Sequence, residues 1–368
     1  MGRMSSLPNP SHLINETSQH YQQLLNIKPR RTKLQIIPRD KWQNFCKRLN
    51  LNHNSEGVFL QRNLTAYLLA DSEYFPLNLF HEYFGHGLFC EYSKHGKFIE
   101  RLERRLAREE RRKFRGKQFT LEELIKFREQ NPLFKLLQKA RNNLLYEVFA
   151  IWTEYYLSEL FGVGDKFEQK YKRTPKKLRD NLEQLANFRK NYGDLALFYH
   201  LGFPKYYDTD KIRILLRNIF KDKINSARLV ILYGSRKPYS DIDLFVVSDE
   251  VGNFRNDWLD IYALTPDEFE YSVSVFRISV TDPLMTGEFV LGDEDYFEQK
   301  KRQLQEQPIT KEAIYYNIIR SREQGILAKQ FPKNSKEREI GNSYAETYLR
   351  NALALKQGKR KLTKNLLS

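Results

Sequence analysis

The alternation of apolar and polar residues predicts a first half of the chain that combines two short strands with long helices. Residues 33–38 (KLQIIP) and 64–70 (LTAYLLA) are apolar, partly β-branched and bounded by turn-forming residues, which is the pattern of strands. An apolar helix, PLNLFHEYFGHGLFCEY, begins at Pro76, and a second runs from about Leu133 to Leu160. Gly162 favours the end of the second helix, because glycine is a common capping residue there.

A strongly charged segment lies between these two apolar helices. Residues 97–117 contain ten Lys or Arg and four Glu, and the pairs Glu100 with Arg104 and Glu109 with Lys113 are spaced i,i+4. The pattern predicts a helix with a solvated face, and a polyanion-binding arm is the alternative interpretation.

The pattern changes near residue 208, where a second domain is expected to begin. A helix, DTDKIRILLRNIF, precedes β-rich runs at 228–233, 242–247 and 258–264. The chain after about residue 305 is expected to form helices. The breaks expected in this tail are Pro332 and Gly341.

We therefore expect an α+β protein of two domains, since 368 residues exceed what one hydrophobic core usually organises. The first domain combines helices with a small β component, and the second is a mixed sheet with helices. The predicted segments are a polar leader (1–32), the first domain (33–164), a basic helical linker (165–207), the second domain (208–304) and a helical tail (305–368).

Charge and cysteine content narrow the classes of partner and compartment. The chain has 62 Lys and Arg against 46 Asp and Glu, which gives a formal net charge of +16 and favours polyanions such as RNA, DNA or nucleoside triphosphates (NTPs). Cys46 and Cys90 lack CxxC spacing, so neither a disulfide framework nor a cysteine zinc site is indicated. No apolar run approaches the roughly 20 residues of a membrane span. A soluble, cytoplasmic protein with no membrane partner is expected.

The stretch RLVILYGSRKPYSDIDLFVVSD carries the residue types of phosphoryl-transfer chemistry. Asp241 and Asp243 face the same side of a predicted strand, where two carboxylates repel each other unless a divalent cation lies between them. Hard oxygen ligands suit Mg²⁺. The preceding turn offers backbone N–H groups, a hydroxyl and positive charge to a triphosphate, through Gly234, Ser235, Arg236 and Lys237.

This stretch resembles the minimal nucleotidyltransferases of the polymerase-β superfamily over residues of about 226 to 300. The matching positions are Gly234, Ser235, Ser240, Asp241, Asp243 and Leu244. The family has a third carboxylate on a following strand, and Leu259-Asp260-Ile261 supplies one, so the resemblance implies that Asp260 is a metal ligand and general base. The loop between Ser235 and Asp241 is shorter than the family's usual loop.

The first apolar helix contains His81, Glu82 and His86 in an arrangement close to that of zinc metallopeptidases. Two histidines at i and i+4 share one face of an α-helix, but His86 is at i+5, roughly 140° away from His81 around an ideal helix. A π-bulge would restore the alignment, and Gly85 stands where such a bulge could be accommodated.

The spacing resembles the His-Glu-x-x-Gly-His motif of the dipeptidyl-peptidase III group, matched by His81, Glu82, Gly85 and His86. The segment beginning Tyr146-Glu147 resembles the part of gluzincin aminopeptidases whose glutamate binds zinc. The resemblance implies a zincin-like domain in which His81, His86 and Glu147 hold Zn²⁺ and Glu82 activates water for peptide hydrolysis. Glu154 would orient a ligand histidine, and the candidates for stabilising the oxyanion are His200, Tyr155 and Tyr156.

Taken together, the residues predict a Mg²⁺-dependent nucleotidyltransferase that moves a nucleotidyl group from an NTP to a protein or RNA acceptor. It would be fused to a zinc metallopeptidase with a peptide substrate. The alternative is a non-catalytic protein that senses NTPs or binds RNA and contains a structural metal site. The sequence leaves the nucleotide base, the acceptor and the cleavage target open.

Overall fold

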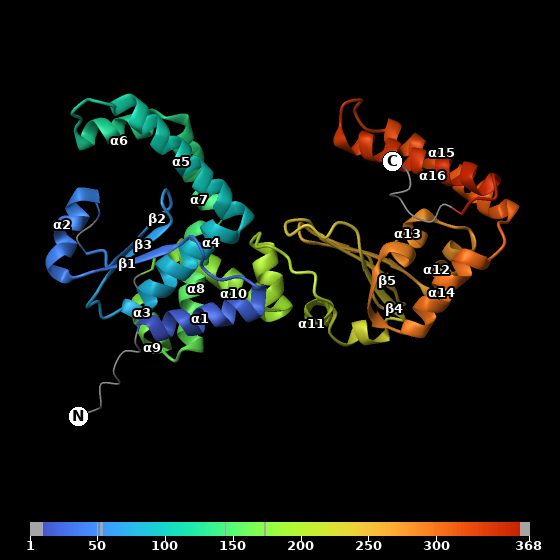
Figure 1. Cartoon of the computed structure of the whole chain (residues 1–368), viewed down its shortest axis with the longest axis horizontal. Coiled ribbons are helices and arrows are strands. Elements are labelled where there is room, and N and C mark those ends of the chain that lie inside the picture. The colour runs from blue at the N-terminus through green and yellow to red at the C-terminus, as the bar shows by residue number, and fades with distance from the viewer. Residues whose placement is uncertain (1–9, 50, 52–53, 144, 173, 361–368) are drawn as a thin grey trace. The chain divides into compact units, whose positions relative to one another are not determined.

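The computed structural model describes residues 10–49, 51, 54–143, 145–172 and 174–360. The chain divides into two compact units, unit 1 up to Tyr206 and unit 2 from Tyr207. Each unit combines helices with one small sheet, which confirms the predicted α+β class (Figure 1). Within the described residues, no helix is both long enough and apolar enough to cross a membrane.

Unit 1 is built around a three-stranded sheet with the order β1-β3-β2. The predicted strands are confirmed as β1 (Lys33–Ile37) and β3 (Thr65–Leu69), which run parallel, and β2 (Gly57–Leu60) adds an antiparallel strand that was not predicted. The helix α2 (Arg39–Leu49) follows β1.

The expectation of a polar leader over residues 1–32 is wrong for its described part. Residues Pro10–Leu25 form the helix α1, which buries one side chain per turn: Leu13, Thr17, Tyr21 and Leu25. Tyr21 stacks on Phe84 at a centroid distance of 6.1 Å. The four-residue spacing of these positions gives α1 a face that packs on unit 1.

The two predicted apolar helices are each divided in the structure. The first consists of α3 (Phe75–Asn78), the π-helix η1 (Leu79–His86) and α4 (Gly87–Tyr92). The second is wrong as a single helix, because α7 (Pro132–Asn143) and α8 (Tyr146–Leu160) are separated at Leu145, which has a left-handed φ of 55°.

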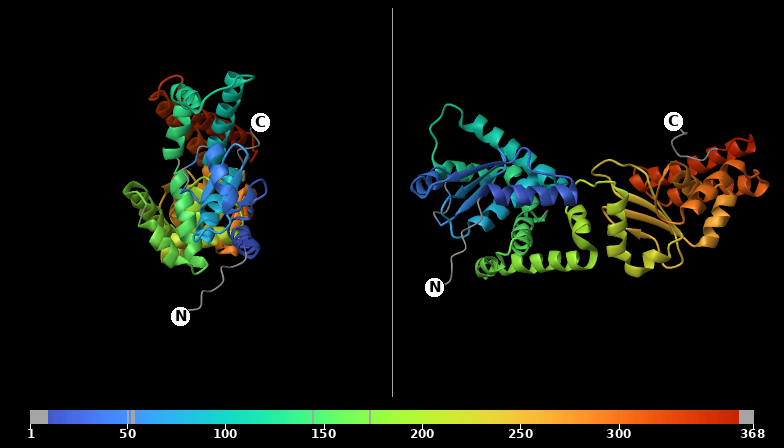
Figure 2. Two further views of the ribbon diagram at one scale, coloured as in Figure 1. Left: turned by 90° about the vertical axis from the view of Figure 1, so that its left-hand side faces the viewer. Right: turned by 60° about the horizontal axis from the view of Figure 1, so that its bottom comes forward.

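The charged segment and the predicted linker are also helical. The helices α5 (Lys94–Phe114) and α6 (Leu121–Gln130) form an arm that extends from the rest of unit 1 (Figure 2). The predicted linker segment contains α9 (Gly164–Tyr171) and α10 (Lys176–His200), and both belong to unit 1. Leu197 and Phe198 of α10 are fully buried.

Unit 2 contains a five-stranded sheet with the order β6-β7-β5-β4-β8. The three predicted strands are confirmed as β4 (Leu229–Tyr233), β5 (Ile242–Val247) and β7 (Leu259–Leu264), and two shorter strands were not predicted, β6 (Phe254–Arg255) and β8 (Glu288–Gly292). The sheet is mixed, because β5 and β7 are parallel while the other pairs are antiparallel.

Helices cover one face of this sheet. The chain enters unit 2 through α11 (Thr209–Phe220) and the short 3₁₀ helix η2 (Lys221–Ser226), and the covering helices are α12 (Pro266–Ser274), α13 (Ile278–Thr286) and α14 (Glu294–Glu306). Phe245 and Val247 of β5 pack on this side together with Phe269 and Val280. Because side chains alternate along a strand, Asp243 falls on the same face as Phe245, at the half-buried end of β5.

The tail forms a helical hairpin of α15 (Lys311–Lys329) and α16 (Lys336–Lys356), with Pro332 between the helices as predicted. The predicted break at Gly341 is wrong, since this glycine lies inside α16. A Cβ atom on Gly341 would lie 2.8 Å from the Cβ of Ala328, so the glycine allows the two helices to approach closely. The basic end of the tail extends into residues 361–368, outside the described residues.

Candidate metal centres

The π-helix brings the two histidines of unit 1 to the same side. A π-helix is wider than an α-helix and its hydrogen bonds join residues i and i+5, so His81 and His86, five positions apart, lie about one turn apart on the same side. Their ring centroids are 4.8 Å apart, and the ring planes are nearly perpendicular at 85°. The predicted π-helical distortion is therefore confirmed.

Gly85 allows this π-helix to lie directly on α8. A Cβ atom at this position would come within 2.8 Å of the Cα of Ala150 and within 3.2 Å of the carbonyl oxygen of Phe80. Any larger residue would separate the two helices or distort the π-helix. Because Glu147 lies one turn before Ala150 on α8, this close packing carries its carboxylate toward the histidines.

Glu147 closes a triangle with the two imidazoles. Its Oε1 lies 3.2 Å from Nε2 of His81, and its Oε2 lies 3.4 Å from Nε2 of His86. Both distances exceed the roughly 2.9 Å typical of an N–H···O hydrogen bond. They are close to the separation of about 3.3 Å between ligand atoms around a tetrahedral ion held at roughly 2.0–2.1 Å, although each histidine faces a different oxygen of Glu147. The three side chains are therefore candidate ligands for a metal ion.

Glu154 lies behind His81, where it fixes the imidazole. Its Oε2 is 3.0 Å from Nδ1 of His81, and its Oε1 is 2.7 Å from Nζ of Lys170. Glu154 is almost fully buried at 3% exposure, so these two contacts compensate the cost of burying its charge. With Nδ1 hydrogen-bonded to a carboxylate, Nε2 of His81 is directed toward Glu147.

Lys170 is a part of this site that sequence reasoning missed. It also donates to Oδ1 of Asn78 at 3.1 Å, which ties α9 to the helix that precedes the π-helix. The pairing with Glu154 spans 16 positions and two helices. No local spacing rule in the sequence indicates a contact of this kind.

The carboxylates control the protonation of His81. Burial lowers the pKa of His81, but the adjacent carboxylates of Glu147 and Glu154 outweigh burial and raise it to about 10. Burial alone would raise the pKa of Glu147, yet the two histidines hold it well below its usual value. Without a metal, His81 therefore keeps a proton between two carboxylates.

Glu82 stands at the edge of the same cluster. One of its carboxylate oxygens and a nitrogen from each of His81 and His86 all lie within 4.8 Å of one another. The side chain of Glu82 passes close to β2, where a Cβ atom on Gly57 would be 3.0 Å from the Cγ of Glu82. Gly57 therefore leaves the room that this glutamate occupies.

The site opens into a groove of about 300 Å³ formed by α8, α9 and the start of α10. His81 and the half-exposed Glu147 line it, together with Lys170 and Tyr171. His86 does not line the groove and is buried, with its ring stacked on Tyr146 at a centroid distance of 4.1 Å. Solvent and a small substrate can therefore reach the cluster from one side.

The three candidates for oxyanion stabilisation lie elsewhere. Tyr155 donates its hydroxyl hydrogen bond to Glu159, and the hydroxyl of Tyr156 bonds the imidazole of His20. His200 is an exposed residue at the end of α10. None of the three lines the groove, so this expectation is wrong.

Unit 2 brings three carboxylates together at the end of its sheet. Asp241 precedes β5, Asp243 lies within it, and Asp260 is the register partner of Asp243 on the parallel strand β7. One oxygen from each of the three carboxylates lies within 4.8 Å of the others. All three residues are partly exposed, so a hydrated divalent cation can reach them.

The turn after β4 lies against this cluster. Gly234 has a φ of +77°, and a Cβ atom on it would be 2.1 Å from Oδ2 of Asp243, so only glycine brings the backbone this close. The hydroxyl of Ser240 points to that of Ser235 at 3.4 Å. Tyr207, which sequence reasoning missed, donates its hydroxyl hydrogen bond to the carbonyl of Lys237 at 2.9 Å and restrains the loop.

The two basic residues of this loop are placed differently. Arg236 forms an ion pair with Glu288 of β8 at 2.7 Å, and both side chains are partly exposed. Lys237 is exposed. Only Lys237 is therefore available to a triphosphate without the exchange of an existing partner.

Neither protein-family models nor curated proteins give a match to this chain.

Proposed function

We propose that unit 1 is a zinc-dependent hydrolase acting on peptides. The observation that carries this proposal is the convergence of Nε2 of His81, Nε2 of His86 and the carboxylate of Glu147, at ligand-to-ligand distances of 3.2 and 3.4 Å. Two imidazoles and one carboxylate are a donor set of catalytic zinc sites, which keep a fourth position open. Zinc bound there would supply Lewis acidity and a water with a lowered pKa.

The chain's own residues have distinct roles in this proposal. Glu82, beside the two histidines, accepts the proton of the attacking water and returns it to the leaving amine. Glu154 holds the imidazole of His81 in orientation through Nδ1. The groove in front of Glu147 receives the substrate, and its size admits a short stretch of peptide rather than a folded protein.

The test compares Glu82→Gln with wild type on a mixture of peptides from a digested proteome, read by mass spectrometry. Loss of general-base catalysis is expected to slow cleavage about 10²–10⁴-fold while zinc stays bound. Glu73→Gln, an exposed glutamate earlier in the same unit, is the matched control. Cleavage by Glu82→Gln at the wild-type rate would refute the assigned role.

For unit 2 we propose a magnesium-dependent nucleotidyltransferase. The specific observation in favour is that a Gly-Ser turn, whose glycine leaves no room for a Cβ atom, lies directly on the cluster of Asp241, Asp243 and Asp260. Backbone N–H groups of such a turn suit phosphate oxygens, and the carboxylates suit Mg²⁺.

In the proposed reaction an acceptor hydroxyl of a protein or RNA attacks the α-phosphorus of an NTP, and pyrophosphate leaves. Asp260 takes the proton of the hydroxyl, while Asp241 and Asp243 hold the cation. Ser235 and Lys237 are placed to contact the phosphates from the turn.

Transfer of label from an α-³²P-labelled NTP to acceptors in a cell lysate tests this proposal. Asp243→Asn is expected to abolish transfer, whereas Asp249→Asn, with the same charge change just beyond the other end of β5, is expected to retain it. Transfer that persists in Asp243→Asn would end the assignment. NTP binding without transfer by wild type would favour the non-catalytic sensor instead.

A further inference from the structure

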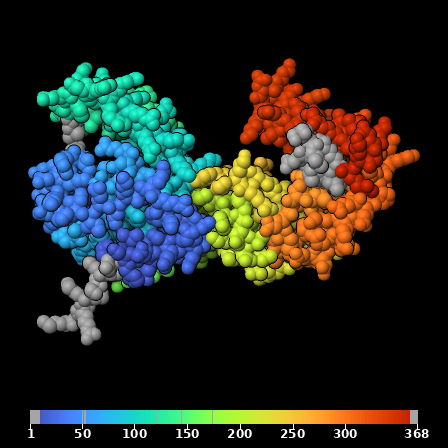
Figure 3. Space-filling model, viewed as in Figure 1, coloured from blue at the N-terminus to red at the C-terminus, as the bar shows by residue number. Residues whose placement is uncertain are grey.

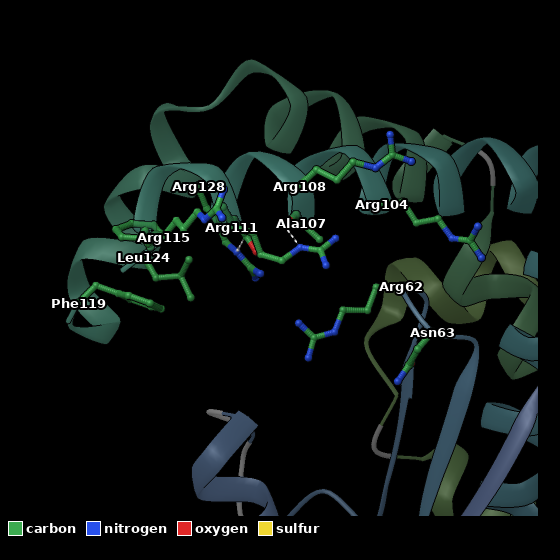
Figure 4. A pocket seen from close by; sticks show the side chains of 12 residues that line it. Arg62, Asn63, Arg104, Ala107, Arg108, Arg111, Arg115, Phe119, Leu124 and Arg128 are labelled. Carbon is green, nitrogen blue, oxygen red and sulfur yellow. Dashed lines mark hydrogen bonds and ion pairs between the residues drawn. The ribbon is translucent and has the colours of Figure 1, made fainter. Parts of the chain in front are cut away.

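A second concave site in unit 1 is lined by arginines and lies away from the histidines. It is a groove of about 960 Å³ between the arm formed by α5 and α6 and the turn that joins β2 to β3 (Figure 4). In the space-filling view the arm stands over the blue part of the same unit (Figure 3). The positively charged residues lining the groove are Arg62, Arg104, Arg108, Arg111, Arg115 and Arg128.

Four of these arginines follow one face of α5. At about 100° per residue, Arg104, Arg108 and Arg111 fall within roughly 60° of one another around the helix, and Arg115 continues the row at its end. The Cα atoms of Arg104, Arg108 and Arg111 are separated in turn by about 6 and about 4.5 Å along the axis. The row therefore carries an arginine every three or four positions over about three turns.

Much of this charge is not neutralised within the protein. Glu110 is the only acidic residue among the described residues that line the groove, and it is paired with Arg128 at 2.6 Å. Arg104 pairs with Glu100. In the described part of the chain, no ion pair holds Arg62 or Arg108. The same is true of Arg111 and Arg115 among the described residues. A bound polyanion would relieve the repulsion among them.

The apolar end of the groove adds a second kind of contact. Phe119 is 47% exposed and packs against Phe114 at a centroid distance of 4.4 Å, so its position is held by the tip of the arm. An exposed ring next to a row of guanidinium groups matches what single-stranded nucleic acids need, since phosphates pair with arginine and bases stack on aromatic rings. An acidic peptide would use the charges but has no need of the ring.

We propose that this groove binds a single-stranded nucleic acid, with its phosphates along the arginine row and a base on Phe119. The opposite wall contributes Arg62, whose guanidinium faces the row from α5 in Figure 4. The proposal is independent of both metal centres, because no residue of the groove belongs to either cluster. Loss of zinc or magnesium is therefore expected to leave this binding unchanged.

The test measures fluorescence anisotropy of the full chain with a labelled 12-nucleotide oligo(U), at several salt concentrations. The groove variant is the double variant Arg108→Ala/Arg115→Ala, which removes two unpaired charges from the row. The control variant is Arg105→Ala/Arg112→Ala, which removes two exposed arginines at the same spacing outside the groove. Four phosphate contacts predict a slope of log K against log salt of about −3, and each lost contact reduces it by about 0.7.

The groove variant is expected to bind at least tenfold more weakly at low salt, with a slope smaller by about 1.4, while the control variant keeps the wild-type slope. Phe119→Ala is expected to weaken binding about tenfold without changing the slope. Equal losses in the two arginine pairs would overturn the proposal. The proposal would also be overturned if a duplex or polyglutamate displaced the labelled oligo(U) as effectively as unlabelled oligo(U) does. Comparing oligo(dT) with oligo(U) shows whether the strand is DNA or RNA.

Discussion

Replacing Asp243 by asparagine is expected to stabilise the metal-free form of unit 2 and to remove its response to magnesium. One oxygen from each of the three carboxylates of this unit lies within 4.8 Å of the others, and Arg255 contacts Asp260 at 3.5 Å. Arg255 is 80% exposed, so it neutralises Asp260 poorly. Folding must therefore bring like charges together.

The size of this repulsion follows from the distance. At 4.8 Å, the upper limit of the oxygen separations in this cluster, two unit charges repel by about 0.9 kcal/mol in bulk water and by about 3.5 kcal/mol at an effective dielectric of 20. For partly exposed groups an intermediate value of about 1–1.7 kcal/mol per pair applies. Because Asp243 takes part in two such pairs, the uncharged variant is expected to gain about 2–3 kcal/mol in free energy of unfolding without metal.

Hydrogen exchange of the buried amides of β4 and β5, in increasing urea, measures the stability of unit 2 separately from unit 1. For a Kd of about 1 mM, 10 mM Mg²⁺ is expected to add about 1.4 kcal/mol to wild type and nothing to Asp243→Asn. Asp249→Asn is the control, with the same charge change outside the cluster and an unaltered response to Mg²⁺.

Two results would refute this reasoning. If Asp243→Asn is less stable than wild type in EDTA, the carboxylate makes a structural contact whose stabilising free energy exceeds the repulsion. If Asp243→Asn and wild type gain equally from Mg²⁺, the ion binds elsewhere in the chain.

Two further predictions concern the zinc site. Gly85→Ala is expected to cost about 1–3 kcal/mol in free energy of unfolding and to weaken zinc binding, because the added Cβ would lie 2.8 Å from the Cα of Ala150. Thermal melts with and without zinc measure both effects, and Gly164→Ala, whose Cβ has open space around it, is the control. Equal stabilities of Gly85→Ala and Gly164→Ala would contradict the prediction. Glu154→Gln is expected to reduce zinc affinity about 10–100-fold, because His81 loses the carboxylate that fixes its orientation. Competition for zinc with a chromogenic chelator measures this affinity, and a wild-type value in Glu154→Gln would refute the prediction.

The sequence predicted the parts of the fold that depend on short-range patterns. The three longest strands of unit 2, β4, β5 and β7, were predicted because apolar, β-branched runs between turn residues have few other structures available, whereas β6 and β8 were missed. The π-helix was found because the i,i+5 spacing of His81 and His86 could place both on one face only in that conformation, and because Gly85 stood between them.

The errors came from features that depend on tertiary contacts. The apolar positions of α1 are diluted by polar residues, so its four-residue spacing was overlooked and a leader was expected. The interruption at Leu145 involves neither glycine nor proline, and no local signal marks it. Gly341 serves the packing of α15 on α16 rather than a break, a distinction that requires knowledge of its neighbour Ala328.

The site residues also divide into those that the sequence indicated and those that depend on tertiary contacts. Glu147 was predicted from the resemblance of its segment to that of gluzincin aminopeptidases, and it lies beside both histidines. Lys170 and Tyr207 hold their sites through pairings between distant helices and loops, which sequence spacing does not indicate.

Zinc content per chain, measured by elemental mass spectrometry on protein dialysed against metal-free buffer, tests the central assignment most directly. About one zinc per chain is expected in wild type, and Glu147→Gln, which replaces a half-exposed carboxylate without altering its shape, is expected to lose most of it. Absence of zinc from wild type, or full retention by folded His81→Ala and Glu147→Gln, would contradict the assignment.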